Sequence, residues 1–275
     1  MFRALKIRQK LLIALLSMGI VPLLAAIWIS SSDTTHALTQ RGYQELTSVR
    51  EVKKLVLTDY FTERFADLAI LANSVAHLQE HNESADRVSA EAHTFYKQFK
   101  ELEQYYDLFL IDPDGVIFYS VERESDFTTS LKNGPYADSN LADLYKKVLA
   151  SNTQVIVDFK PYAPSNNAPA AFIGQPVTDE EGNVTMIVAL QLSIDHLNEV
   201  MTERVGFGET EETYLVGPDK LMRSDSYLDP SNRTVLASFA NPAKGRVDTD
   251  ASRAALSGES DTRILVDYNG HTVLS

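Results

Sequence analysis

The stretch "YYDLFLIDPDGVIFYSV", Tyr105 to Val121, decides the fold. Two runs rich in aromatic, leucine, isoleucine and valine residues stand on either side of Asp112-Pro113-Asp114-Gly115. Turn-forming residues between two such runs predict a β-hairpin. The segment therefore predicts an antiparallel sheet, and the sequence on both sides shows what surrounds it.

Three more strands are predicted after the hairpin. They are "TQVIVDF", "AAFIGQPVTD" and "NVTMIVALQLS", and the last two are joined by a turn at 180–183. A short helix, "DSNLADLYKKVLA", precedes them, with Asp138 or Ser139 as its N-cap. A connecting helix, "IDHLNEVMTERV", follows them and ends at Gly206.

The chain before the hairpin is predicted to be helical. Apolar residues recur at steps of three and four from Leu46 to Tyr60 and from Phe61 to Leu78, which indicates one long amphipathic helix. Its apolar stripe needs a partner, which is a following helix, a second chain, or both. A second helix, "SADRVSAEAHTFYKQFKELEQYY", is predicted with Ser84 as its cap. Its apolar face is formed by Val88, Phe95, Phe99 and Leu102.

The amino-terminal thirty residues differ from the rest. Four basic residues within 1–10 precede the uncharged run Leu11 to Ile29, which is about the length that spans a bilayer. A cleaved signal peptide is the alternative, but "AAIWISSSD" lacks its small-residue cleavage site. Residues 1–10 are predicted to be cytoplasmic, residues 11–30 to form a transmembrane helix, and residues 31–275 to lie outside the cytoplasm.

Composition excludes some functions. The chain has no cysteine, so no disulfide supports the exported part, which favours the inner membrane and periplasm of a bacterium. A formal net charge of −13 argues against nucleic-acid binding, which needs clustered Lys and Arg.

A second unit is predicted at 206–275. "ETYLVGPDKLMRSDS" repeats the strand, turn and strand pattern of the first hairpin. "TRILVDYNGHTVLS" contains Asn269-Gly270, the dipeptide preferred in type I′ hairpins. The chain stops in this strand, so the second unit is predicted to be incomplete.

Catalytic motifs are weak. "HLQEH", His77 to His81, matches an inverted zinc-hydrolase pattern, but it would lie at the end of a helix rather than in a cleft. "DPDG" lacks the further ligands of a calcium loop. The chain is therefore predicted not to be an enzyme and to hold no metal or cofactor.

The segment "DFKPYAPSNNAPAAFIGQPV", Asp158 to Val177, is the remaining candidate for a binding site. If the strands around it are neighbours, "KPYAPSNNAP" connects them and places Tyr162 beside Ser165, Asn166 and Asn167. Apolar walls with a few polar groups are typical of small-molecule sites. A proline-stiffened surface loop with Tyr162 packed on the sheet fits equally well.

The whole layout resembles the double-Cache sensor regions of bacterial methyl-accepting chemotaxis proteins. The similarity rests on the order of parts and on strings such as "VALQLSIDHLNEVM" and "GETEETYLVGPDKLMRSDS". It implies an α+β fold with a transmembrane helix, a helical stalk at 31–105, a complete membrane-distal PAS-like unit at 106–205 and a proximal PAS-like unit at 206–275. It also implies a homodimer joined through the long helix, and a signal transmitted across the membrane for chemotaxis.

The resemblance further implies a small-molecule site in the distal unit. Its expected residues are Tyr136, Asp158, Tyr162, Ser165, Phe172 and Gln191. The amino-acid-binding branch of the family has an Arg-x-Trp-Tyr motif and two aspartates, whereas this chain has "LKNGPYADS", Pro164 and Gln191 at those positions. Without these carboxylates an α-ammonium group loses partners worth roughly 1.5–3 kcal/mol each, so a standard amino-acid receptor is not predicted. The same input region also precedes histidine kinases and cyclases, and a passive structural ectodomain is a further alternative.

Overall fold

The computed structural model describes residues 6–80, 88–204 and 207–275. The chain divides into two compact units. One is formed by residues up to Glu51 together with Ser260–Ser275, and the other by Val52–Glu259. Each unit is considered by itself below.

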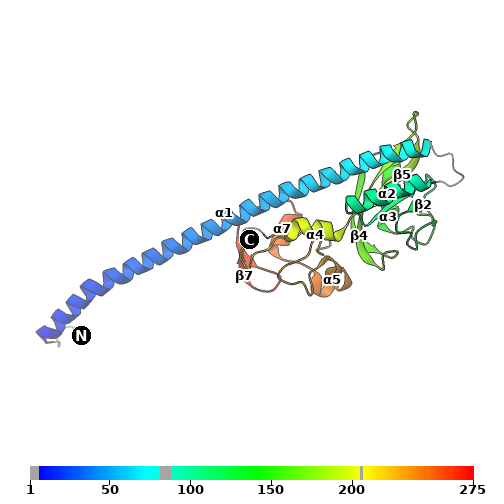
Figure 1. Ribbon diagram of the computed structural model, residues 1–275. Helices are drawn as coiled ribbons and strands as arrows, with labels where there is room; N and C mark the ends of the chain where they lie inside the picture. Colours follow the sequence, from blue (N-terminus) through cyan, green and yellow to red (C-terminus); the bar gives the residue numbers. More distant parts are fainter. Residues whose placement is uncertain (1–5, 81–87, 205–206) are drawn as a thin grey trace. The chain divides into compact units, whose positions relative to one another are not determined.

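Helix α1 runs without interruption from Ile7 to Glu80, with Pro22 inside it (Figure 1). The long helix predicted from the apolar periodicity is thereby confirmed, and it is continuous with the apolar amino-terminal run. Among the described residues, α1 is the one helix that is long and apolar enough to cross a membrane, with a window of mean hydropathy 2.5. No residue of that window is buried, which suits a lipid environment.

The first unit also contains a hairpin of β6 (Ile264–Val266) and β7 (Thr272–Leu274), as predicted. The prediction of a type I′ turn in this hairpin is wrong. Type I′ requires a positive φ at both central residues, and of Asn269 and Gly270 only Gly270 has one.

The second unit is built on a sheet of five antiparallel strands. Its strands are β1 (Asp107–Ile111), β2 (Ile117–Ser120), β3 (Val155–Tyr162), β4 (Ala168–Thr178) and β5 (Val184–Gln191). Their spatial order is β2-β1-β5-β4-β3. All the strands predicted between residues 105 and 193 are present, and the α+β fold class is confirmed.

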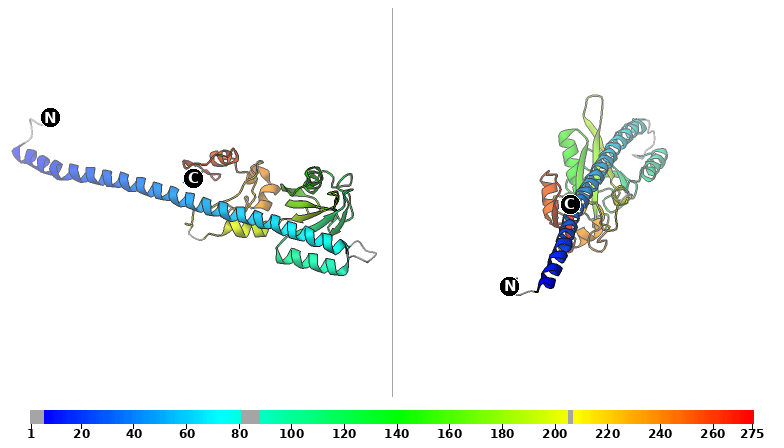
Figure 2. Two further views of the ribbon diagram at one scale, coloured as in Figure 1. Left: turned by 90° about the horizontal axis from the view of Figure 1, so that it is seen from above. Right: turned by 90° about the vertical axis from the view of Figure 1, so that its left-hand side faces the viewer.

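Helices cover both faces of this sheet. On one face, buried residues of α1 and of α2 (Ala90–Leu102) pack with Leu108, Leu110 and Leu190. On the other face, α3 (Asn140–Ser151) packs with Phe109, Phe172 and Ala189. Figure 2 shows α2 beside the end of α1, whereas α3 lies on the far side of the strands. Successive strand residues therefore point alternately into two separate hydrophobic cores, one on each face of the sheet.

Side-chain caps fix where the helices of this unit begin. Ser139 caps α3 as predicted, since its hydroxyl accepts from the N–H of Ala142 at 3.1 Å. Helix α2 begins later than predicted and is capped by Ser89, while Ser84 lies outside the described residues. Leu102, expected on the apolar face of α2, is exposed because it is the last residue of the helix.

Between the five-stranded sheet and the β6–β7 hairpin, the chain forms short helices rather than the predicted strands. The connecting helix α4 (Ile194–Thr202) is followed by α5 (Val235–Ala240), α6 (Pro242–Gly245) and α7 (Asp250–Leu256). The predicted strand pair at 212–226 is reduced to one β-bridge between Val216 and Met222. Two backbone hydrogen bonds join these segments, from Gly217 to Leu221 and from Arg223 to Leu215. Ser224 and Ser238 accept from the N–H groups of Leu215 and Met222. Helix α4 ends at Thr202, with Glu203 as its C-cap, which is earlier than the predicted end at Gly206. Gly206 itself lies outside the described residues.

The connection between β3 and β4 is a tight turn. Asn166 and Asn167 have φ of 55° and 58°, and the N–H of Ala168 donates to the carbonyl of Ser165 at 2.9 Å. Asparagine tolerates this left-handed conformation better than most residues, which explains the Asn-Asn pair. The turn holds Tyr162 and Ser165 at the end of the sheet.

Candidate functional site

The candidate site lies on the face of the sheet that α3 covers. Asp107 of β1 stands opposite Gln191 of β5, and Gln191 stands opposite Phe172 of β4. Side chains of paired residues project from the same face. Asp107, Gln191 and Phe172 therefore form one row across three strands, and all three are buried.

The loop between β2 and α3, residues 121–139, lies against this row. Asp126 of the loop is fully buried, and its Oδ2 accepts a hydrogen bond from the Tyr162 hydroxyl. The ring of Tyr162 in turn meets Phe172 edge to face, with centroids 5.0 Å apart. This aromatic contact and hydrogen bond connect the loop to β3 and β4.

A second series of hydrogen bonds runs through Glu124. Its Oε1 accepts from the Tyr106 hydroxyl at 2.9 Å, and its Oε2 accepts from the Ser165 hydroxyl at 2.7 Å. The amide nitrogen of Gln191 donates to the Ser165 oxygen at 3.4 Å, which is a long bond. We call this set of residues the distal site. It consists of the row across the sheet together with Glu124, Asp126, Tyr162 and Ser165.

Burial sets the electrostatics of the distal site. It raises the pKa of Asp107 to about 6, against the hydrogen bonds from Ser120 and from the backbone of Leu108 and Glu122. Burial also raises the pKa of Asp126, while the Tyr162 hydroxyl works in the opposite direction. Desolvation penalises a charged carboxylate, so Asp107 and Asp126 are both costly to keep ionised.

Most of the expected site residues lie together. Tyr162, Ser165, Phe172 and Gln191 belong to the distal site, and Tyr136 lies on the same loop as Asp126. The Tyr136 hydroxyl hydrogen-bonds Ser125 at 2.7 Å. Their role in binding a ligand stays a prediction.

Asp158 does not share these contacts. Both of its carboxylate oxygens accept from the guanidinium group of Arg223 at 2.7 Å. A β-bulge in β3 between Val157 and Lys160 interrupts the alternation of side chains at this point. Asp158 therefore joins the sheet to the segment that contains Arg223.

The sequence reasoning missed the acidic side chains. Asp107, Glu124 and Asp126 supply carboxylates from β1 and from the loop 121–139, not from the positions where the resemblance expected them. For Glu124 and Asp126 the signal in the sequence was the acidic run "VERESD" at the end of the hairpin. That run reads equally well as a solvated loop.

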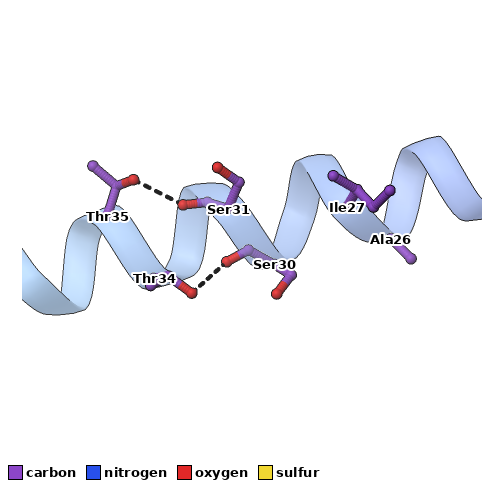
Figure 3. Close-up of a pocket in the computed structure, with 6 residues that line it drawn as sticks. All are labelled: Ala26, Ile27, Ser30, Ser31, Thr34 and Thr35. Atoms are coloured by element: carbon purple, nitrogen blue, oxygen red, sulfur yellow. Dashed lines mark hydrogen bonds between the residues drawn. The ribbon is translucent and has the colours of Figure 1, made fainter.

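Two other polar regions do not form enclosed sites. A hollow along α1 is lined by Ala26, Ile27, Ser30, Ser31, Thr34 and Thr35 (Figure 3). All six belong to one helix, and the Thr34 and Thr35 hydroxyls donate to backbone carbonyls of the preceding turn at 2.7 and 2.8 Å. The hydroxyls therefore satisfy their own helix.

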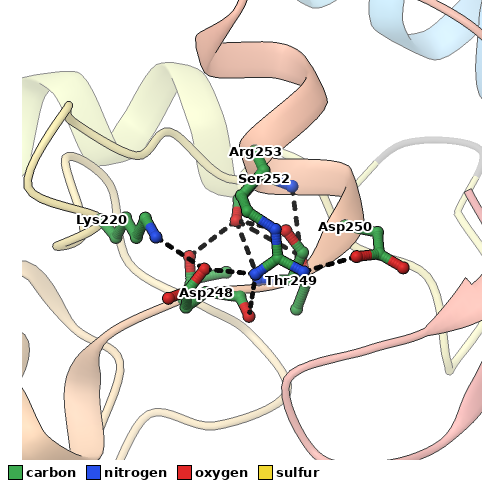
Figure 4. Close-up of polar contacts among 7 residues, drawn as sticks. Lys220, Asp248, Thr249, Asp250, Ser252 and Arg253 are labelled. Atoms are coloured by element: carbon green, nitrogen blue, oxygen red, sulfur yellow. Dashed lines mark hydrogen bonds and ion pairs between the residues drawn. The ribbon is translucent and has the colours of Figure 1, made fainter.

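The second region is an ion-pair network at the start of α7. Asp248 pairs with Lys220 at 2.7 Å and with Arg253, which also pairs with Asp250 (Figure 4). Thr249 and Ser252 complete a capping box. These partners neutralise one another, and the network is a structural feature that fixes the start of the helix.

No metal-binding group of His, Asp and Glu side chains is found among the described residues. The zinc-hydrolase hypothesis for "HLQEH" rests on His81 and the Glu80 side chain, which lie outside that description.

No protein-family model and no curated protein sequence matches the chain. Solved structures do match. The ligand-binding domain of the Pseudomonas fluorescens chemoreceptor CtaA in complex with L-serine has a TM-score of 0.52 and 15% identity, covering 82% of this chain and 84% of that one. The same domain in complex with L-isoleucine gives 0.51 and 15%, covering 82% and 79%. The chain therefore has the α+β fold of the ligand-binding domain of a bacterial chemoreceptor.

Proposed function

We propose that this chain is the ligand-sensing region of a bacterial transmembrane chemoreceptor that binds a small molecule at the distal site. The fold supports this reading. The observation that carries it is the distal site itself, in which buried polar groups from the loop 121–139, the β3–β4 turn and the sheet face meet over Phe172. Convergent polar groups on an apolar floor are typical of small-molecule sites.

The proposal includes an anchored arrangement. Residues 11–30 span the inner membrane, residues 31–105 form the stalk, and residues 106–205 and 206–275 are the distal and proximal units outside the cytoplasm. A ligand shifts such a receptor only by its difference in affinity for two states. Binding at the distal site transmits a signal by displacing the helices that pass through the membrane, on the scale of an ångström or two.

A ligand screen tests the binding function. The full chain in detergent is heated with amines, organic acids, nucleobases or sugars, and a saturable rise in melting temperature identifies a ligand. Tyr162→Phe removes the hydroxyl that Asp126 accepts from but keeps the ring on Phe172, and it is expected to lower ligand affinity about tenfold.

Tyr145→Phe is the matched control. It removes a hydroxyl that donates to the Pro113 carbonyl at 2.8 Å, away from the distal site, and should leave affinity unchanged. No saturable response to any class of compound would contradict the sensing function. Equal losses in both variants would contradict the location of the site.

Cross-linking tests the homodimer. The chain has no cysteine, so single cysteines at Val49 and Val56 report without background. The two positions lie seven residues apart on one face of α1, and Val56 is exposed. Both are expected to form disulfide-linked dimers in membranes, while Thr58→Cys on the opposite side of the helix should not. Failure at both Val49 and Val56, or equal yield at Thr58, would contradict a parallel dimer through α1.

A further inference from the structure

Two buried acceptor atoms of the distal site have no hydrogen-bond donor among the described residues. They are Oδ1 of Asp126 and Oε1 of Gln191. Both residues are almost wholly enclosed, at 0% and 4% exposed. An acceptor left unpaired inside a protein is costly, and such atoms are rare enough to need an explanation.

The directions of the surrounding hydrogen bonds determine which atoms are left over. Ser165 has one hydroxyl proton and gives it to Glu124 at 2.7 Å. Its oxygen can therefore only accept from Gln191, so the Gln191 side chain must present its NH₂ group there. The carbonyl oxygen of Gln191 is then the unpaired atom. In the same way, the Tyr162 proton goes to Oδ2 of Asp126 and leaves Oδ1 unpaired.

Four hydroxyl protons in and next to the site are already donated to carboxylates. Tyr106 and Ser165 donate to Glu124, Tyr162 donates to Asp126, and Ser120 donates to Asp107. These four hydroxyls therefore have no proton left for an incoming molecule, whereas Asp126 and Gln191 each offer it an acceptor.

The charged side chains of the site also favour a cationic ligand. Within the part of the chain that the structure describes, no Lys, Arg or His is ion-paired with Asp107, Glu124 or Asp126. The basic side chains nearest in sequence have other contacts, since Lys100 pairs with Glu122 and Arg123 lies over the Phe127 ring. A cation would therefore neutralise charge that the protein leaves unbalanced.

We propose that the ligand of the distal site is an organic ammonium ion without a carboxylate of its own. Its N–H groups donate to Asp126 Oδ1 and Gln191 Oε1, and its carbon skeleton lies against Phe172. A ligand carboxylate would meet acidic side chains and find no donor, which disfavours both organic acids and α-amino acids. This inference rests on the proposed function, because it names the ligand class of the same site.

A matched series of four-carbon compounds tests the ligand class. n-Butylamine, 1,4-diaminobutane, 4-aminobutanoate and butanoate are titrated by calorimetry into the full chain in nanodiscs of uncharged lipid, with empty nanodiscs as the blank. The two amines are expected to bind about tenfold or more tightly than 4-aminobutanoate, and butanoate not to bind.

Asp126→Asn tests the acceptor directly. The asparagine oxygen can keep the hydrogen bond from Tyr162, but an NH₂ group then replaces the unpaired acceptor. n-Butylamine affinity should fall about tenfold or more. Gln191→Leu, which removes the second acceptor without changing charge, should weaken it too. Asp143→Asn, at an exposed carboxylate of α3 that pairs with Lys160, should have no effect.

The outcomes separate the two proposals. If butanoate or 4-aminobutanoate binds as well as the amines, and Tyr162→Phe weakens that binding, the distal site is a sensor site but its ammonium selectivity is wrong. Unchanged n-butylamine affinity in both Asp126→Asn and Gln191→Leu also overturns the inference. If none of the four compounds binds at millimolar concentration and the wider screen finds no ligand, the sensing function fails as well.

Discussion

Replacing Arg223 by leucine is expected to lower the free energy of unfolding of the full chain by about 2–3 kcal/mol. Arg223 is almost buried and holds both oxygens of Asp158 at 2.7 Å. It also pairs with Asp219 at 3.0 Å, and its guanidinium lies 5.1 Å from the Phe239 ring centroid. The expected loss stays below that of a fully buried pair because Asp158 is half exposed and can be hydrated.

Urea denaturation followed by circular dichroism measures this loss. A second variant disturbs the same contact without changing Arg223 itself. A Cβ on Gly217 would lie 2.0 Å from Nη2 of Arg223. Gly217→Ala should therefore displace the guanidinium and destabilise to a similar degree. Lys160→Ala removes only an exposed pair with Asp143 and should change stability by about 0.5 kcal/mol or less. An unchanged midpoint for Arg223→Leu would show that the contact with Asp158 is energetically neutral.

The hairpins were predictable because a short sequence motif determines the conformation of three of their loops. Asp112, Asp179 and Asp267 each accept, through Oδ1, the N–H groups of the residues two and four positions later. The glycine three positions after each aspartate has a φ of 85° or 86°. This recurring Asp-x-x-Gly loop also explains why the Asn269-Gly270 pair does not form a type I′ turn, since Asp267 fixes the geometry before Asn269 contributes.

The acidic part of the site was not predictable for the opposite reason. The contact between Asp126 and Tyr162 joins residues 36 positions apart, and Asp158 meets Arg223 across 65 positions. The loop 121–139 shows neither period that marks a helix or a strand, so nothing local places its carboxylates over the sheet. The resemblance placed the expected site residues at this end of the sheet, which stays a prediction, and it carried over Asp158, which is bound to Arg223.

Asp107 is expected to make stability depend on pH in a direction opposite to that of the ordinary surface carboxylates. Burial raises its pKa in the folded chain to about 6, from an ordinary value of 3.8. Between these values the folded state binds more protons than the unfolded state, so the free energy of unfolding falls as pH rises. A shift of this size corresponds to roughly 3 kcal/mol between pH 4 and pH 7. The raised pKa of Asp126 adds to the same trend.

The pH dependence of the free energy of unfolding of the whole protein also contains contributions of opposite sign from other carboxylates. Hydrogen bonds from Asn183 lower the pKa of Asp179, and those from Lys220 and Arg253 lower the pKa of Asp248, so both carboxylates favour the folded state as pH rises. Comparison with Asp107→Asn removes these common contributions. The variant should gain stability relative to the unaltered chain as pH rises from 4 to 7.

A carbon-13 titration of the aspartate carboxyl groups in the unaltered chain gives a second measure that does not depend on the folding of Asp107→Asn. Ser120 and three backbone N–H groups donate to Asp107 at 2.7 to 3.1 Å, and these bonds favour its ionised form. Two results together would show that these four bonds affect the pKa of Asp107 more than burial does. The stability difference between Asp107→Asn and the unaltered chain would not change with pH, and Asp107 would titrate below pH 4. Asp107 would then carry its charge at every physiological pH. A midpoint near 6 would instead mean that the row formed with Gln191 and Phe172 loses negative charge in mildly acidic surroundings, and ammonium binding at the distal site should weaken over the same interval.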